Sequence, residues 1–341
     1  MTKKAEFSEQ LERRGAKVYC LDLVKQNDIT ELTDIYKAYK PLRKIIEGER
    51  FDIVHTHLFH STVLGIFTAN RLKLKSVVTR HHSDALYKIQ NPATRKLYLS
   101  LENYINRNAN HIIAPSREVQ KILLERENVP SEKVSLIPYG QTFERFEAIT
   151  PEIISEKRSE LKMNGKLSLV CTSRLFHGKG HVYLFEALAK LIKDGLQANL
   201  FLVGTGDYRP KLEEKLRELE IEDSVRFLGW RNDALAIMAA ADIIVHPSLE
   251  DALSQALIES LMLARPIVAT DISGASDTLR DGKYGRLVPP ADAESFRKAL
   301  QETIDNLESV QTKAHEGRKY LLEYMKAERT AKEYSEIYHR V

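Results

Sequence analysis

Short apolar runs alternate with longer amphipathic segments along almost the whole sequence. The runs at residues 51–57 and 167–172 each lead through a polar loop into a segment with helical spacing of its apolar residues. Strands that are separated by helices pair in parallel and bury both faces of their sheet. The pattern therefore predicts an α/β fold, and a length of 341 residues favours two domains over a single core.

The composition is that of an ordinary globular protein, with 43% apolar and 29% charged residues. We find no apolar run long enough to cross a bilayer, and the polar start MTKKAEFSEQ does not have the pattern of a signal peptide. Cys20 and Cys171 are expected to be buried free thiols, as in a reducing compartment. These features predict a cytoplasmic location.

Charge is unevenly distributed, although the net charge is only +3. Residues 1–140 contain 23 Lys and Arg against 16 Asp and Glu, whereas the remaining residues contain 28 against 32. A basic first half suits an anionic acceptor or peripheral contact with the inner face of a membrane. A scatter of solvated charges explains the same numbers equally well, and we expect no nucleic-acid partner.

The densest group of candidate site residues lies at 246–274, HPSLEDALSQALIESLMLARPIVATDISG. This stretch predicts a strand end, a polar loop, a helix and a second buried strand. Asp251 and Glu259 are eight residues apart, so both carboxylates can face one cleft. Residues 253–255 open the helix, where unpaired backbone N–H groups favour a phosphate. Acidic residues near a helix start also occur simply because they favour the helix dipole.

A second candidate site follows the apolar run at 167–172. Arg174 and Lys179 are five residues apart, so two cations can clamp a diphosphate, and Gly178 allows close approach of the backbone. A Gly-x-Gly turn begins at Gly204, but no third glycine follows to complete a dinucleotide-binding fingerprint. The cationic loop is therefore the stronger of these two signals.

Histidines gather after two of the predicted strands, at His55, His57, His60, His81 and His82. The period of a strand places the first two on one face of the sheet. A metal site is one interpretation, but no Cys, Asp or Glu occurs at ligand spacing, so polar lining of a cleft is favoured. Neither a metal nor another cofactor is expected.

Taken together and in this order, the motifs resemble those of the retaining glycosyltransferases of family 4, which have the GT-B fold. The family pattern of two Glu separated by seven residues matches Asp251 and Glu259, with Glu250 as the alternative if the register slips by one. The family loop Arg-x-x-x-x-Lys-Gly matches Arg174 and Lys179. The resemblance implies two Rossmann-like domains of doubly wound parallel sheets that face each other across a cleft.

The resemblance also implies a reaction, the transfer of a sugar with retention at the anomeric carbon. The donor would be a UDP- or GDP-sugar, and the acceptor a hydroxyl of a glycan or lipid-linked saccharide. The two cations and the helix start would stabilise the leaving diphosphate, and Glu259 would bind the donor ribose. Asp251 and His81 would hold the transferred sugar, with His82 as the alternative histidine.

The residues implied for the site fall into two groups. The catalytic residues are His81, Arg174, Lys179 and Asp251. The donor-binding residues are Gly178, Gly204, Trp230, Leu253, Ser254, Gln255 and Glu259, with Trp230 in a base pocket formed by residues 226–231. A nucleotide-binding GT-B protein without activity and a sugar-nucleotide epimerase are the alternative functions.

The resemblance finally divides the chain. It predicts an acceptor-side domain at 1–140, a linker at 141–165, a nucleotide-sugar-binding domain at 166–311 and a C-terminal helix at 312–341 that crosses back to the first domain. Family members begin with a strand and a Gly-rich turn, which this sequence is expected to lack, so that residues 16–23 form its first strand.

Overall fold

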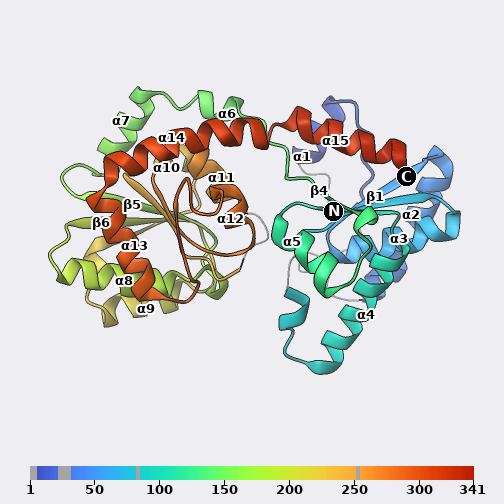
Figure 1. The fold of residues 1–341 in the computed structure, drawn as a ribbon, viewed down its shortest axis with the longest axis horizontal. Coiled ribbons are helices and arrows are strands. Elements are labelled where there is room, and N and C mark those ends of the chain that lie inside the picture. The colour runs from blue at the N-terminus through green and yellow to red at the C-terminus, as the bar shows by residue number, and fades with distance from the viewer. Residues whose placement is uncertain (1–5, 22–31, 82–84, 251–253) are drawn as a thin grey trace. The chain divides into compact units, whose positions relative to one another are not determined.

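The protein is described here from a computed structural model, which describes residues 6–21, 32–81, 85–250 and 254–341. The chain forms two compact units (Figure 1). The first unit contains residues 1–115, 119–137 and 333–341, and the second contains residues 116–118 and 138–332. Each unit is an α/β body built on one parallel sheet, as the alternating pattern predicts.

The first unit has a parallel sheet in the order β1-β2-β3-β4. Its strands are β1 (Ile53–His57), β2 (Lys75–Thr79), β3 (His111–Ala114) and β4 (Val134–Leu136). The helices up to β4 are α1 (Glu6–Arg13), α2 (Leu32–Glu49), α3 (Phe59–Leu72), α4 (Pro92–Asn108) and α5 (Arg117–Lys121), with short turns η1 (Ala85–Lys88), η2 (Ile122–Arg126) and η3 (Ser131–Lys133).

Helix α3 packs closely against the start of this sheet because Gly65 has no side chain. A Cβ added there would lie 2.3 Å from Cγ2 of Thr56 in β1. The register pairs His57 of β1 with Thr79 of β2, so the carboxyl ends of the two strands are level. This alignment brings the residues that follow both strands to the same edge of the sheet.

The strand expected at residues 16–23 is not found in its described part. Residues 16–21 join no sheet, and β1 is an edge strand of the described sheet. Instead this segment lies beside α2, where Lys17 Nζ is 2.6 Å from Glu49 Oε2 and Tyr19 also bonds Glu49. An extended segment becomes a strand only when another strand lies within hydrogen-bonding reach, and a groove between residues 17–21 and β1 separates the two here.

The second unit has a six-stranded parallel sheet in the order β10-β9-β8-β5-β6-β7. Its strands are β5 (Leu167–Thr172), β6 (Ala198–Val203), β7 (Val225–Gly229), β8 (Ile243–His246), β9 (Ile267–Thr270) and β10 (Arg286–Val288). Its helices are α6 (Glu144–Glu147), α7 (Pro151–Glu160), α8 (His181–Lys193), α9 (Arg209–Glu218), α10 (Ala234–Ala240), α11 (Gln255–Met262), α12 (Ser273–Leu279), α13 (Ala293–Asp305) and α14 (Leu307–Tyr324), with turns η4 (His177–Lys179) and η5 (Glu222–Ser224).

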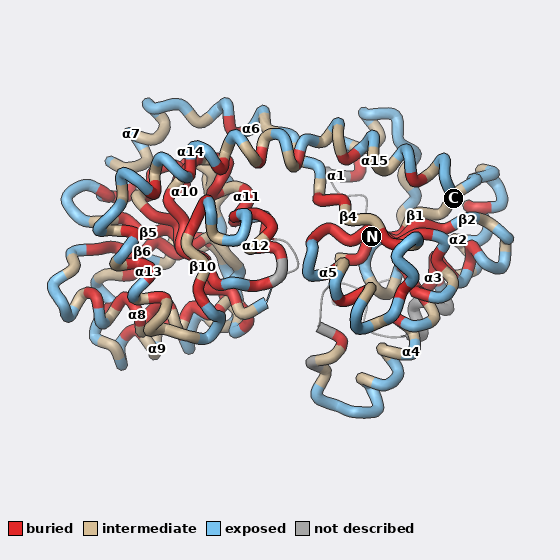
Figure 2. The backbone as a smooth tube through the Cα atoms, viewed as in Figure 1, coloured by how far each residue is buried: buried red, intermediate tan, exposed pale blue. Residues whose placement is uncertain are grey.

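The core of the second unit lies on both faces of its sheet. The central strands β5, β6 and β8 are buried along almost their whole length (Figure 2). One apolar cluster contains Phe201, Leu257 and Leu321, and the other contains Phe185, Leu188 and Phe296. This rigid sheet is the base from which the loops at its carboxyl edge project.

Residues 141–165 differ from the expected linker, because they form part of the second unit. Phe146, Leu161 and Met163 are buried in one of its apolar clusters. The guanidinium of Arg158 donates to the Ala240 carbonyl at 2.6 Å, which fastens α7 beside α10. The charged sequence of α7 suggested a solvated connector, but one side of the segment supplies core residues.

The C-terminal region also differs from a single crossing helix that starts at residue 312. Helix α14 packs on α11 within the second unit, and a Cβ at Gly317 would lie 2.5 Å from Cδ1 of Leu261. Helix α15 (Ala327–Arg340) begins in the second unit, and its residues 333–341 belong to the first. Among the described residues, no helix is both long and apolar enough to cross a membrane.

Candidate functional site

The cationic loop after β5 holds its two positive side chains against one aromatic ring. The Arg174 guanidinium lies 5.1 Å from the centroid of Phe176, and Lys179 Nζ lies 5.9 Å from the same centroid. Gly180 makes the tight exit into α8 possible, since its φ is +64° and a Cβ there would lie 2.0 Å from the Pro247 carbonyl oxygen. The structure therefore brings together the two cations that the sequence singled out.

The chain after β8 runs along this loop. The Leu249 amide donates to the Gly178 carbonyl at 2.9 Å. A Cβ added to Gly178 would lie 2.9 Å from Glu250 Oε1, so the missing side chain gives room for that carboxylate. Glu250 is thus the carboxylate that the structure places at the loop, whereas Asp251 and Leu253 lie outside the described residues.

The turn at Gly204 packs against the backbone of the same loop. A Cβ at Gly204, where φ is +141°, would lie 2.0 Å from the Ser173 carbonyl oxygen. Leu175 donates its amide to the Thr205 carbonyl at 2.8 Å, and Gly204 donates to the Gly229 carbonyl at 2.8 Å. The glycine serves this close backbone packing and brings the ends of β5, β6 and β7 together.

The start of helix α11 is the phosphate site that the sequence predicts for the second unit. Ser254 precedes it, is buried and makes no side-chain cap. The first amides of a helix have no partner within the helix, so they can donate to an anion. Gln255 is the first residue of the helix, and its amide pairs with that of Gln141, with nitrogen–oxygen distances of 3.3 and 3.2 Å.

Glu259 lies one turn into α11 and is almost buried. Its side chain is 14% exposed, and its Oε1 is 3.0 Å from Nη2 of Arg145. Neither Arg145 nor Gln141 was identified from the sequence, because both lie in the segment interpreted as a linker. No spacing rule connects them to α11, and only the packing of residues 141–165 into the second unit reveals the contact.

In the predicted base pocket at 226–231, the two arginines bond other parts of the same unit, whereas the tryptophan is exposed. Arg226 donates to the Leu161 carbonyl at 3.0 Å, and Arg231 bonds Asp233 at 2.7 Å and Glu160 at 2.9 Å. Hydrogen bonds from Arg231 hold the pKa of Asp233 well below its usual range. Trp230 is 70% exposed, so its ring is presented to solvent.

In the first unit, three histidines at the ends of β1 and β2 form what we call the histidine cluster. His57 Nδ1 is 2.9 Å from His81 Nε2, so one of these nitrogens donates and the other accepts. The rings of His55 and His57 lie 4.5 Å apart between centroids. His55 in turn bonds the Tyr338 hydroxyl at 2.6 Å and the Thr79 hydroxyl at 2.9 Å.

Desolvation favours the neutral form of two of these histidines, His55 and His57. Desolvation, followed by the neighbouring imidazoles of His57 and His81, lowers the pKa of His55 to about 4. Desolvation also lowers the pKa of His57. A neutral imidazole both donates and accepts a hydrogen bond, so such a group suits uncharged polar ligands. His82, the alternative histidine, lies outside the described residues.

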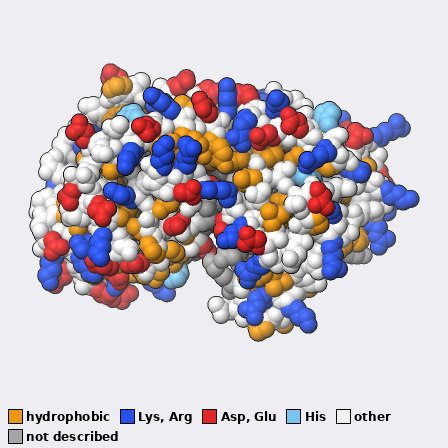
Figure 3. All heavy atoms as spheres, viewed as in Figure 1, with side chains coloured by type: hydrophobic (Ala, Val, Ile, Leu, Met, Phe, Trp, Pro, Cys, Tyr) orange, Lys and Arg blue, Asp and Glu red, His pale blue; other side chains and the backbone are white. Residues whose placement is uncertain are grey.

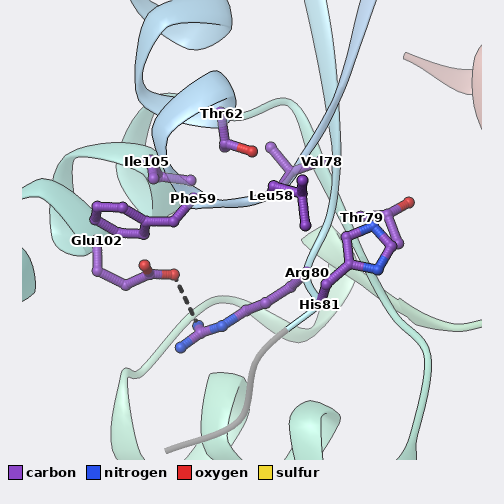
Figure 4. Close-up of a pocket in the computed structure, with 9 residues that line it drawn as sticks. All are labelled: Leu58, Phe59, Thr62, Val78, Thr79, Arg80, His81, Glu102 and Ile105. Carbon is purple, nitrogen blue, oxygen red and sulfur yellow. Dashed lines mark ion pairs between the residues drawn. The ribbon is translucent and has the colours of Figure 1, made fainter. Parts of the chain in front are cut away.

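A small pocket opens beside His81, and its wall contains a buried ion pair (Figure 4). Arg80 points away from His81 toward Glu102, with 3.1 Å between Nη1 and Oε1, and it also pairs with Glu127. Phe59 and Leu58 from the start of α3 complete the rim. Because Arg80 is 3% exposed, this pair anchors the backbone from which His81 projects.

Among the described residues, no group of three or more His, Cys, Asp and Glu side chains is arranged to hold a metal ion. In the histidine cluster, His57 bonds His81, and His55 bonds the hydroxyls of Thr79 and Tyr338, whereas Glu102 pairs with Arg80. The chemistry that this arrangement offers is hydrogen bonding in the first unit and anion binding in the second.

Two family models match the chain in succession. The model described as Glycosyltransferase Family 4 matches residues 5–145, and that described as Glycosyl transferases group 1 matches residues 166–306. The chain is 28% identical over 274 residues to the Escherichia coli UDP-Gal:alpha-D-GlcNAc-diphosphoundecaprenol alpha-1,3-galactosyltransferase, covering 79% of this chain and 70% of that protein.

Other proteins agree with this match. An uncharacterised glycosyltransferase of Methanocaldococcus jannaschii is 27% identical over 303 residues, covering 85% of this chain and 76% of its own length. The structure of Anabaena HepE in complex with UDP and glucose superposes with a TM-score of 0.81 at 21% identity, covering 100% of this chain and 90% of that one, which shows a shared GT-B fold. The chain belongs to the family 4, group 1 glycosyltransferases, enzymes of the GT-B fold that transfer sugars.

Proposed function

We propose that the protein transfers a sugar from a UDP-sugar to a hydroxyl of a lipid-linked saccharide, with retention at the anomeric carbon. The observation that carries the donor assignment is the pair of cations, Arg174 and Lys179, on the ring of Phe176. Two cations beside glycine backbone suit a diphosphate, which gains negative charge as its bond to the sugar breaks. UDP is favoured over GDP because the E. coli relative uses UDP-Gal and HepE binds UDP.

In this proposal the second unit binds the donor. Arg174, Lys179 and the first amides of α11 stabilise the leaving diphosphate, while Glu259 accepts hydrogen bonds from the ribose. Gly178 and Gly204 contribute through the close backbone packing of the loop beside the two cations, and Trp230 stacks on the base. No metal is required, because the fixed cations supply the charge that an ion would otherwise bring.

The sugar-holding contacts belong to His81 and a carboxylate of the 250–251 pair. His81 donates or accepts a hydrogen bond to a sugar hydroxyl. The acceptor hydroxyl attacks from the face that the diphosphate leaves, and a phosphate oxygen of the leaving group takes its proton. No protein nucleophile is needed for this front-face substitution, which accounts for retention.

The acceptor is proposed from charge and from the relative. The E. coli relative acts on a diphosphoundecaprenol-linked sugar, and residues 1–140 of this chain carry 23 Lys and Arg against 16 Asp and Glu. In the face that Figure 3 shows, basic side chains stand among acidic ones, without a single-sign surface. Leu97 on α4 is 44% exposed and directly follows Lys96 in the sequence. It therefore offers an apolar contact beside a positive charge. We therefore propose a weak peripheral contact with an anionic membrane from the cytoplasmic side.

Calorimetric titration with UDP, GDP and ADP tests the donor site first. We expect UDP to bind in the micromolar range to the wild type, and Glu259→Ala to weaken that binding at least tenfold. Glu302→Ala, which removes an exposed carboxylate from α13, serves as the control and should bind UDP normally. A folded wild-type protein that binds none of the three nucleotides would contradict the proposal.

The reaction is then tested with labelled UDP-sugars and a diphosphopolyprenyl-linked saccharide in anionic vesicles. Retention predicts an α-linked product from an α-linked donor, which NMR of the product reads directly. Free sugar released at the same rate without acceptor would instead indicate an epimerase. If vesicle binding were the same at low and high salt, the membrane contact would not be electrostatic and that part of the proposal would be wrong.

A further inference from the structure

Four side chains form a connected group at the start of α11, and we call them the Glu259 cluster. The group consists of Gln141, Arg145, Gln255 and Glu259. Arg145 Nη2 lies 3.0 Å from Glu259 Oε1, and Gln255 Nε2 lies 3.5 Å from the same oxygen. All four residues belong to the second unit, although Gln141 and Arg145 come from the segment that precedes its first strand.

The Arg145 guanidinium makes two contacts, one with the Phe146 ring and one with the Glu259 carboxylate. Its neighbour Phe146 is 4% exposed within an apolar cluster, which fixes the backbone of α6. The guanidinium lies 4.8 Å from the centroid of the Phe146 ring, a cation–π distance. The Arg145 side chain is 43% exposed, whereas that of Glu259 is 14% exposed. The arginine is therefore the more exposed partner of the ion pair.

Gln141 is fixed through its backbone. Its amide donates to the Met325 carbonyl at 2.7 Å, and its carbonyl accepts from the Ala327 amide at 3.1 Å. Because both of its backbone groups are bonded, the Cα of Gln141 is held in place, and its side-chain amide can pair with that of Gln255. That pairing holds Gln255 Nε2 near Glu259, so the amide reinforces the contact that Arg145 makes.

The two contacts leave the carboxylate asymmetric. Within the part of the chain that the structure describes, the ion pair and hydrogen bond to the Glu259 side chain both engage Oε1. A carboxylate has about four acceptor positions on its two oxygens. Holding one oxygen fixes the rotation of the group and leaves Oε2 as a directed acceptor.

We propose that Arg145, supported by Gln255, is a positioning residue that orients Glu259 so that Oε2 accepts a ribose hydroxyl of the donor nucleotide. The inference rests on the proposed function, in which Glu259 binds the ribose. It adds that the discrimination between ribose and deoxyribose depends on Arg145, a residue that does not itself contact the nucleotide. An uncharged side chain at 145 leaves the carboxylate free to rotate and to bond water instead.

The test compares UDP with 2′,3′-dideoxy-UDP by calorimetry. A hydrogen bond to a charged group contributes roughly 1.5–3 kcal/mol, which corresponds to about a 10- to 100-fold preference of the wild type for UDP. Arg145→Met should reduce that preference to a few-fold while leaving dideoxy-UDP affinity almost unchanged. Arg145→Lys keeps the charge without the planar fork and should retain an intermediate preference.

Further variants separate positioning from general damage. Arg297→Met removes an arginine that pairs with Glu294 on the surface of α13, and it should keep the wild-type preference. Glu259→Gln should lose most of the preference, and adding Arg145→Met to it should change little more, because both act through one carboxylate. Circular dichroism checks folding, and Gln255→Ala, which should lower the preference about two- to threefold, replaces Arg145→Met if that variant does not fold.

The outcomes distinguish the inference from the function on which it rests. A wild type that binds no nucleoside diphosphate overturns the proposed function and the inference with it. A wild type that binds UDP and prefers ribose, with the same preference in Arg145→Met, overturns the inference alone. Equal loss of UDP and dideoxy-UDP affinity would also overturn it, since that result would indicate contact with the phosphates rather than positioning of Glu259.

Discussion

The histidine cluster of the first unit and the cationic loop of the second differ in charge. In the histidine cluster, desolvation lowers the pKa of His55 to about 4 and also lowers that of His57, so these two rings remain neutral at physiological pH. In the cationic loop, Arg174 is exposed and brings the positive charge of its guanidinium. One group offers directed hydrogen bonds, and the other offers fixed positive charge.

The difference follows from what supports each group. The histidines are supported by strand ends and by Tyr334 and Tyr338 of α15, which contact His55 and Thr79. The cations are supported by the face of Phe176, which favours positive charge without neutralising it. Directed hydrogen bonds suit uncharged hydroxyls, whereas fixed positive charge suits an anion such as a diphosphate.

The largest expected effect comes from removing fixed charge in the second unit. Arg174→Ala and Lys179→Ala should each lower kcat by roughly 10²–10³, because each removes a donor that stabilises charge developing on the leaving diphosphate. Steady-state kinetics with the UDP-sugar measures this change.

Matched controls are available on the helices that follow. Lys193 and Arg217 are exposed residues of the same unit, so Lys193→Ala and Arg217→Ala should keep kcat within about twofold. If Arg174→Ala and Lys179→Ala retained near-normal turnover with intact folding, the cations of the loop would not stabilise the leaving diphosphate, and the contrast with the neutral histidine cluster would be unrelated to catalysis.

The next effect concerns stability and pH in the first unit. The unfolded chain binds a proton at the ordinary histidine pKa of about 6.5, whereas folded His55 does so only near pH 4. Stability is therefore complete above pH 6.5 and decreases as the pH falls toward 4, by up to about 3 kcal/mol from this residue. His55→Gln can keep bonds to Tyr338 and Thr79 without titrating, so it should flatten this decrease.

Thermal unfolding followed by circular dichroism between pH 7.5 and 4.5 measures the effect. The flattening should be partial, because burial also lowers the pKa of His111 and of His181 to about 4. His315→Gln changes an exposed histidine of α14 and should leave the pH dependence unaltered. The same slope in His55→Gln and the wild type would show that His55 is not kept neutral by the fold.

Much of the second unit could be predicted from the sequence because its signals are local. Apolar runs of strand length predict β5, β6, β8 and β9, since buried parallel strands are apolar on both faces. Arg174 and Lys179 are five residues apart with Gly178 between them, which predicts a loop that brings the two cations together. In the structure both cations lie near the ring of Phe176. A few residues of contiguous chain determine such a feature.

Features that depend on distant partners could not be predicted in this way. The charged pattern of α7 indicates a solvated helix, but it does not reveal that Phe146 and Met163 enter the core. Because that packing was not predicted, Arg145 was not connected with Glu259. Likewise the period of β1 places His55 and His57 on one face, whereas the bond from His57 to His81 depends on the register with β2. Periodicity reports burial, and it does not report which partner fills the space.

The smallest effect tests whether the exposed ring of the second unit belongs with the cationic loop. Trp230 is 70% exposed, so Trp230→Ala should not change the melting temperature measurably. If the ring stacks on the base, UDP affinity should fall about fivefold, the lower end of what stacking of a base on an aromatic ring contributes.

Pyrophosphate has no base, so it should bind Trp230→Ala and the wild type equally, whereas Arg174→Ala should bind both UDP and pyrophosphate more weakly. Trp230→Phe should keep most of the UDP affinity, and Phe51→Ala, an exposed aromatic of the first unit, should keep all of it. Unchanged UDP affinity in Trp230→Ala would remove the base pocket from residues 226–231 and leave the diphosphate contacts as the part of the donor site that stands.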